Sequence, residues 1–371
     1  MKKISIFLCL ILILGFVGVT TADTNIKDTM DFQGETVNLT FDQALEKAKI
    51  NSIQGKKLEW NKEKARGSYF DNYQNASQLG AMGARLDEEM LTAMADFSKA
   101  YVDKNYEAEI NVLKTTVMNQ YYGVLQLGEV VHINKENVAI KEKLYKDTLV
   151  KFDLGLLAQK DVLTAEYDYI KAQTDYELAI NNYNKAKMGF NLFLGLDPMK
   201  NTALTDNIIY AEMPDISLSK AVSEALIHRN EIEGLKIVMD IQDIGFKKAS
   251  ARYSDRTATY INAKVAYEEA KHNYENIFKQ IEVDVRAKYM DMVQKKNAIE
   301  AGKKAVEKAE ATLKMTNLSF ELGMALVTDV QQVQAMVMQS KLGLSQAILD
   351  YNLAVDAFNA SIGSGTTSIH L

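Results

Sequence analysis

Large and small side chains alternate along this chain with a period of seven residues. Between residues 162 and 190 the large positions hold Val162, Tyr169, Tyr176, Tyr183 and Phe190, and the small ones hold Ala165, Ala172, Ala179 and Ala186. This spacing is that of the a and d seam of a coiled coil. Because a strict spacing of seven under-winds an α-helix, it also predicts a left-handed supercoil.

The pattern occurs twice. Residues 151–195 align with 319–363 at a constant offset of 168, with 13 of 45 positions identical. The large positions of the second copy are Val330, Val337, Leu344, Tyr351 and Phe358. A matching seven-residue column precedes each copy, over 110–152 and 278–320. Each preceding helix should have roughly 45 to 60 residues, on the order of 70 to 90 Å. The sequence therefore predicts an all-α, two-repeat bundle of very long antiparallel coiled-coil helices.

Each repeat contains one helical hairpin with a tight tip. Gly155 and Gly323 follow helical runs and suit the left-handed conformation that ends a helix. Asp161 and Asp329 come six residues later and suit the N-cap of the returning helix. We therefore expect both chain reversals at these glycines.

The organisation of the whole chain follows from its helix boundaries. Thr40 and Gln43 resemble a capping box at the start of the first helix. Its counterpart starts at Ser217, at an offset of 177, so the first half has nine extra residues, around 75–97. No stretch alternates over the roughly 9 to 11 residues of a transmembrane β-strand, and no strand of any kind is expected. The expected parts are a signal peptide (1–22), an extended N-terminal segment (23–38), helical repeat 1 (39–195), an inter-repeat linker (196–216), helical repeat 2 (217–363) and a flexible tail (364–371).

The N-terminal segment 1–22 is typical of an export signal. Lys2 and Lys3 precede an apolar run over 4–18, and small residues lead to a cleavage position after Ala22. The run is about 15 residues long, shorter than the ~20 that span a bilayer, which favours cleavage over an uncleaved anchor. The only cysteine, Cys9, lies within the run. The exported chain is thus expected to contain no disulfide and no thiol chemistry.

Charge and composition argue against nucleic acid binding and against catalysis. Without the two N-terminal lysines, 41 basic and 49 acidic residues give a formal charge of −8, which disfavours nucleic acid. The four histidines occur singly, and no HExxH motif or phosphate-binding glycine loop is present. Glu268 and His272 share a helix face, but such a pair is usually a surface contact. We expect no enzyme activity, no metal site and no cofactor.

The repeated sequence motifs resemble those of the TolC-like outer-membrane efflux proteins. They are the tips from Phe152 to Val162 and from Phe320 to Val330, the closing Phe190-Asn191-x3-Gly195 and Phe358-Asn359-x3-Gly363, and the helix openings at 39–48 and 218–230. The likeness covers about 39–363. It implies a homotrimer whose twelve helices form a hollow cylinder in the cell envelope, at the outer membrane or in the periplasm. It also implies that the tips meet a membrane fusion or adaptor protein of an inner-membrane pump.

The chain differs from that family at the end opposite the tips. Family members insert a pair of membrane strands between the first and second helix of each repeat. The corresponding segments here, 75–97 and 252–262, contain no alternating strand. We therefore expect this chain to lack the β-barrel insertions and to end in helix turns. The Met-rich stretch 79–94 could touch lipid, but its acidic residues favour a coiled-coil end that packs on itself.

The resemblance singles out candidate residues at the tips. The adaptor-docking candidates are Phe152, Gly155, Leu156, Asp161, Phe320, Gly323, Met324 and Asp329. Asp161 and Asp329 are either helix caps, which is the favoured interpretation, or acids at the closed end of the tunnel. The regular spacing of Tyr169, Tyr176 and Tyr183 favours helix packing over ligand stacking.

Two functions remain open on the sequence alone. One is a trimeric conduit that exports small molecules or peptides. The other is a structural coiled-coil envelope protein of the same fold that passes no solute.

Overall fold

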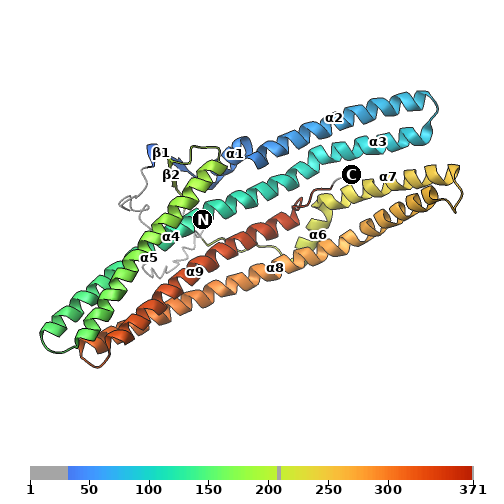
Figure 1. Ribbon diagram of the computed structural model, residues 1–371. Helices are drawn as coiled ribbons and strands as arrows, with labels where there is room; N and C mark the ends of the chain where they lie inside the picture. Colours follow the sequence, from blue (N-terminus) through green and yellow to red (C-terminus); the bar gives the residue numbers. More distant parts are fainter. Residues whose placement is uncertain (1–31, 207–209, 370–371) are drawn as a thin grey trace, which may run out of the picture.

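The protein is an elongated array of long helices, shown by a computed structural model that describes residues 32–206 and 210–369 (Figure 1). The predicted signal peptide lies outside these residues. The elements of the first half are β1 (Gln33–Leu39), α1 (Phe41–Asn51), α2 (Ile53–Ala81), α3 (Arg85–Ala100), the π-helix η1 (Tyr101–Asn105), α4 (Tyr106–Asp153) and α5 (Gln159–Phe193). Those of the second half are β2 (Lys200–Leu204), α6 (Leu218–His228), α7 (Asn230–Arg252), α8 (Ala258–Glu321) and α9 (Val327–Ile362). The expected all-α bundle of very long helices is confirmed.

The internal repeat of the sequence is also a repeat of structure. An offset of 168 relates the start of α5 at Gln159 to that of α9 at Val327, and the end of α4 at Asp153 to that of α8 at Glu321. Helix α8 is a single helix of 64 residues, whereas the π-helix interrupts its counterpart in the first half. Helices α1 and α6 have 11 residues each, and their starts are related by the offset of 177.

Side-chain caps start these two short helices. The Thr40 hydroxyl accepts the Gln43 N–H at 3.3 Å, and the Gln43 side chain accepts the Thr40 N–H at 3.1 Å. The Ser217 hydroxyl accepts the Lys220 N–H at 3.3 Å. Two helix breaks were not predicted. One at Ser52 separates α1 from α2, and one at Arg229 separates α6 from α7.

The helices lie side by side in one layer (Figure 1). Near the hairpin tips α4 packs between α5 and α9, and α9 packs between α4 and α8. Toward the other end α3 packs between α2 and α7, and α7 also packs on α8. Aromatic and branched side chains fill the layer, including Tyr121, Ile299, Tyr351 and Phe358, all fully buried. Helices α5 and α2 form one border of the layer, and α8 forms the other.

A short parallel pair of strands was missed by the sequence analysis, which expected no strand. Strand β1 pairs with β2, so that Val37 lies opposite Thr202 and Leu39 opposite Leu204. Only Leu39 and Thr202 of the two strands are buried. Because most of the pair lies at the surface, its sequence does not alternate, and the usual strand signal is weak.

The C-terminal tail also differs from expectation. Residues 364–369 were expected to be flexible, but they lie along α4 and α7. Asn111 donates to the Gly365 carbonyl and Asn230 to the Thr367 carbonyl, at 2.8 and 2.7 Å. Asn105 of the π-helix donates to the Ile369 carbonyl at 2.8 Å and accepts its N–H at 3.2 Å. The tail therefore joins the first half of the chain to the second.

The end opposite the tips is made of helix turns. Gly83, with a φ of 76°, lies in the turn between α2 and α3, and residues 253–257 join α7 to α8. The segments 75–97 and 252–262 are described throughout and contain no strand. Over the described ranges, no helix has the apolar length that crossing a membrane requires.

Candidate functional site

The two hairpin tips share one backbone design. At the first tip the Leu156 N–H donates to the Lys151 carbonyl at 2.9 Å, and the Gly155 N–H to the Phe152 carbonyl at 2.8 Å. At the second tip the same two bonds run from Met324 and Gly323 to carbonyls at 319 and 320, at 2.8 and 3.1 Å. This pair of bonds is the Schellman motif, which satisfies the last carbonyls of a helix.

Glycine is required at these corners by conformation. Gly155 has a φ of 75° and Gly323 a φ of 71°, in the left-handed region that other residues adopt at a cost. A Cβ built on either glycine would meet nothing within 4 Å. The tips therefore lie open at the surface. A larger side chain at either glycine would clash with no other part of the chain.

Asp161 and Asp329 stabilise the returning helices from a position other than the predicted one. The N-cap residues are Ala158 and Leu326, which have no side-chain acceptor. Each aspartate is the third residue of its helix, and its carboxylate accepts the N-cap N–H, at 3.1 Å in the first tip and 2.9 Å in the second. The N-cap assignment is thus corrected to N3, while the stabilising effect on the helix start is retained.

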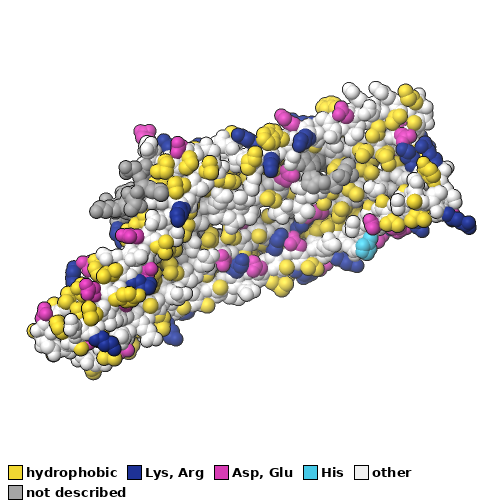
Figure 2. Space-filling model, viewed as in Figure 1, with side chains coloured by type: hydrophobic (Ala, Val, Ile, Leu, Met, Phe, Trp, Pro, Cys, Tyr) yellow, Lys and Arg dark blue, Asp and Glu magenta, His cyan; other side chains and the backbone are white. Residues whose placement is uncertain are grey.

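The end that carries the tips exposes many apolar side chains. Leu156 is 68% exposed and Met324 is 72% exposed. The other large apolar residues exposed there are Val150, Phe152, Leu154, Leu163, Met315, Leu318, Leu322 and Leu326. Hydrophobic side chains lie among charged ones on this end of the molecule (Figure 2). Apolar exposure concentrated in this way is typical of a protein contact surface.

The two tips are joined to each other, and their phenylalanines differ. The Lys151 ammonium donates to the Phe320 carbonyl at 2.6 Å and lies 3.5 Å from the centre of the Phe320 ring. Phe320 is 6% exposed and packs with Leu144 and Val330. Phe152, its equivalent in the first repeat, is 38% exposed.

The predicted seam residues lie inside the helix layer. Phe190, Val337, Tyr351 and Phe358 are buried, and Tyr169, Tyr176, Tyr183 and Leu344 are partly buried. Tyr169 stacks on Tyr145 with ring centres 6.1 Å apart. This contact joins α5 to α4, as expected of a residue that packs one helix on another.

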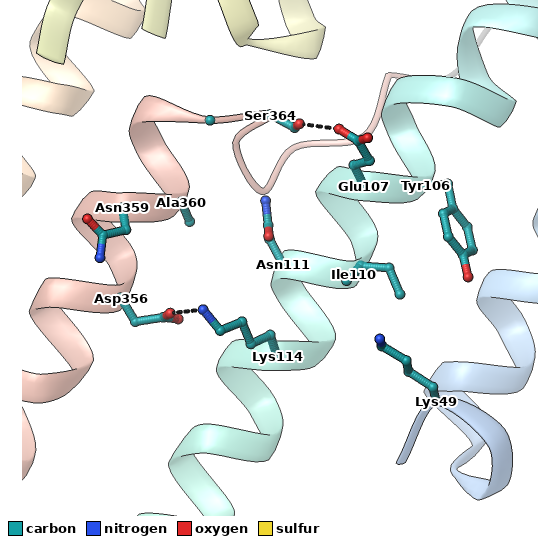
Figure 3. Close-up of a pocket in the computed structure, with 11 residues that line it drawn as sticks. Lys49, Tyr106, Glu107, Ile110, Asn111, Lys114, Asp356, Asn359, Ala360 and Ser364 are labelled. Atoms are coloured by element: carbon teal, nitrogen blue, oxygen red, sulfur yellow. Dashed lines mark hydrogen bonds and ion pairs between the residues drawn. The ribbon is translucent and has the colours of Figure 1, made fainter. Parts of the chain in front are cut away.

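A partly open cavity of about 530 Å³, with mostly polar and charged residues among those that line it, lies between α1, α4 and α9 (Figure 3). Two of its acidic groups are already paired: Asp356 with Lys114 at 2.6 Å, and Glu107 with the Ser364 hydroxyl at 2.6 Å. Burial and a hydrogen bond to Glu59 raise the pKa of Tyr106, on the cavity wall, to about 12. The cavity is assembled from three distant segments, so no local motif pointed to it.

The described part of the chain contains no cluster of metal-ligating side chains. No group of three or more His, Cys, Asp or Glu side chains there could hold a metal ion. His272, which the sequence places on the same face as Glu268, contacts the Asn276 amide at 2.7 Å. His132 and His228 each pair with a glutamate one helical turn away, at the surface.

Comparison with known proteins identifies the fold. No protein-family model and no curated protein matches the chain. Among solved structures, CusC matches with a TM-score of 0.74 at 12% identity, over 93% of this chain and 96% of CusC. The outer membrane protein VceC of Vibrio cholerae matches with a TM-score of 0.69 at 14% identity, over 88% and 97%. The CmeC outer membrane channel of Campylobacter jejuni matches with a TM-score of 0.68 at 14% identity, over 88% and 86%. This chain therefore has a TolC-like fold.

Proposed function

We propose that the protein is an exported efflux component of the cell envelope, at the outer membrane or in the periplasm. Three copies form a helical conduit, and the conduit docks by its hairpin tips on the adaptor protein of an inner-membrane pump to export small molecules or peptides. The proposal rests above all on the paired tips, which expose apolar side chains at one end of a helix layer with two open borders. The number of copies and the class of partner come from the resemblance.

The two borders of the layer carry apolar side chains. On α5 the exposed apolar residues are Leu163, Tyr167, Ile170, Leu178 and Leu192. On α8 they are Ile261, Val265, Val283, Met290, Met315 and Leu318. Burying one such side chain fully contributes about 1.5–3 kcal/mol. Burial of part of this apolar surface would favour joining the α5 border of one copy to the α8 border of the next.

The internal repeat supplies a template for that contact. Within one chain α4 packs on α9. In the internal repeat, α8 corresponds to α4, and α9 corresponds to α5. If the packing of α4 on α9 also occurs between copies, it places α8 of one copy against α5 of the next. The contact is head-to-tail and closes into a ring when the rotation per copy allows it.

Cysteine cross-linking tests the assembly. Gln126 bonds to Gln346 within the chain at 2.9 Å, and an offset of 168 maps this pair onto Gln294 and Leu178. With a reversible thiol cross-linker, the double variant Gln294→Cys/Leu178→Cys should give bands of two and three chain masses. The matched control Gln126→Cys/Gln346→Cys should cross-link within one chain and keep the monomer mass. A monomer that gives no ladder would overturn the conduit.

Charge substitution at the tips tests docking. Leu156→Glu and Met324→Glu alter exposed side chains, so the protein should fold and assemble normally while ethidium efflux from cells falls at least several-fold. Met82→Glu is the control, because Met82 is 79% exposed at the opposite end. Unchanged efflux with normal protein levels would instead favour a structural envelope protein of the same fold without solute transport.

A further inference from the structure

Resting on the proposed ring, we infer that one ion pair selects the neighbouring copy: the Glu166 carboxylate on α5 of one copy pairs with the Lys308 ammonium on α8 of the next. The partner that this surface fits is a second copy of the same chain. We call the contact of α4 with α9 within one chain the intrachain seam. The contact of α8 with α5 of the next copy is the interchain seam, and the intrachain seam is its template.

The register of the intrachain seam is set by side-chain contacts. Gln126 donates to Gln346 at 2.9 Å, and Glu136 lies 3.2 Å from Lys341. In this antiparallel register, residue 334 of α9 lies opposite residues 138–143 of α4. Residue 334 is seven positions before Lys341, so it is on the same face of α9. Ile140 is four positions after Glu136, on the face of α4 that meets α9.

The position of Gln334 is enclosed by helix packing. Gln334 is 6% exposed, and within the described part of the chain its side-chain oxygen has no hydrogen-bond partner. Ile140 across the seam is apolar and has no side-chain donor. A carboxylate enclosed at such a position needs a cation beside it, because the burial of an unpaired charge is costly.

The internal repeat replaces this neutral pair by two opposite charges. At the offset of 168, Gln334 corresponds to Glu166 and Ile140 corresponds to Lys308. In the free chain Glu166 is partly buried and Lys308 is exposed. Over the described residues neither side chain takes part in an ion pair, whereas Lys304, one turn before Lys308, does. The two charges are therefore available to each other when α8 of one copy meets α5 of the next.

The acids closest to Lys308 along α8 have partners in their own chain. Glu310 lies 3.6 Å from Lys341 of α9, which draws it toward the packed side of α8. Glu307 lies 2.6 Å from Lys304, with both side chains well exposed. Lys308 therefore has no acid of its own helix in contact, and an acid from the next copy can supply the missing charge.

The surroundings of Glu166 make the identity of its partner important. Leu163, Tyr167 and Ile170 lie within one turn of it and are 57%, 65% and 54% exposed in the free chain. When a neighbour covers these side chains, water around the carboxylate is displaced and its interaction with a nearby charge strengthens. A matching cation is then favoured, and an apolar or acidic residue in its place is penalised.

The ion pair therefore acts on specificity more than on affinity. Apolar contact along the seam has no preferred direction and would tolerate a shift of one helix along the other. A shift by one turn moves Glu166 away from Lys308 and leaves a carboxylate among apolar side chains. The pair thus fixes the register between copies and excludes helical chains that have no cation at this position.

Charge reversal and its rescue test the pair in the purified full-length mature chain. Sedimentation over a range of concentrations gives the concentration at which half of the chains are assembled. Glu166→Lys and Lys308→Glu should each raise it roughly tenfold or more, and Glu166→Lys/Lys308→Glu should return it to within about threefold of the parent. Glu142→Lys is the matched control, because Glu142 lies on α4 inside the layer and pairs with Lys146 of the same helix. It should remain within about threefold of the parent.

Mixing provides a second readout that depends on selection. When the tagged Glu166→Lys/Lys308→Glu chain is refolded together with the parent, each unlike contact places two like charges together. Mixed rings should therefore be rarer than random exchange gives, and random mixing would overturn the inference. If the parent assembles but single reversals have no effect, or the double variant is not restored, the ion pair is wrong and the ring stands. A parent that stays monomeric at every concentration would overturn the ring and the ion pair together.

Discussion

Substituting Gly155 and Gly323 tests two reasons for glycine at the tips. One is the positive φ of the backbone, and the other is a bare surface that a partner can approach closely. Val is disfavoured at the positive φ of Gly155 and Gly323 because its branched Cβ crowds the backbone, at about 1–2 kcal/mol per residue. No clash adds to this cost, since nothing lies within 4 Å of either Cβ position. Gly155→Val/Gly323→Val should therefore lose about 2–4 kcal/mol and still fold.

Asn provides the matched comparison because it enters the left-handed region more readily than Val. Thermal unfolding of the Gly155→Asn/Gly323→Asn variant should show a Tm close to the parent, with the Val variant lower by a few degrees. Gly343→Ala serves as a control, since Gly343 is a helical glycine with open space around it. If the Val and Asn variants have equal Tm values, the positive φ is not the reason for glycine at the tips.

Efflux by the Asn variant then reports on the surface alone. The Asn side chain projects into space that is empty in the free protein. If an adaptor approaches the tip backbone closely, efflux should fall although the Tm is maintained. Normal efflux by the Asn variant would mean that the partner does not contact these two corners.

Three further outcomes are expected from the described contacts. Burial raises the pKa of Asp284, but hydrogen bonds from Arg229 and Lys288 outweigh it and hold this pKa below its usual value. The stability it contributes is present above about pH 4 and is lost as the pH falls further, so Asp284→Asn should flatten the acid side of a Tm–pH profile. An acid limb equally steep in the variant would mean that Asp284 is not the group that titrates. Ultraviolet titration should find a tyrosine with a pKa of about 12 that is missing in Tyr106→Phe, and an unchanged curve would contradict the burial of Tyr106. Asn105→Ala removes both bonds to the tail and should cost about 1–3 kcal/mol; proteolysis should then release the C-terminus faster, and unchanged cleavage would mean that the tail is held elsewhere.

The features that sequence analysis located correctly depend on neighbouring residues. The capping box links Thr40 to Gln43, only three positions apart. Each corner glycine ends its helix through hydrogen bonds within a single turn. The repeat at an offset of 168 is visible because both hairpins retained the same packing period. Asp161 was assigned to the N-cap instead of N3 because its spacing from the glycine suits either position.

The features that were missed depend on distant residues. Arg229 interrupts the helix between α6 and α7, where its guanidinium bonds to Glu231 and to Asp284 of α8. Asn105 ends the π-helix and bonds to Ile369 near the C-terminus. No local propensity encodes such partners, so the sequence read locally predicts a continuous helix at Arg229 and a free tail.

Duplication within one chain has a physical consequence for a ring of hairpins. If each chain carried a single hairpin, every contact around the ring would be identical, and a residue that strengthened one contact would strengthen all of them. With two hairpins per chain, Lys151 and Ser319 occupy equivalent positions and yet differ, as do Asp356 and Met188. One contact can then carry an ion pair, such as that of Lys114 with Asp356, which the equivalent contact lacks. In the proposed ring, contacts within a chain and contacts between chains can therefore differ in strength.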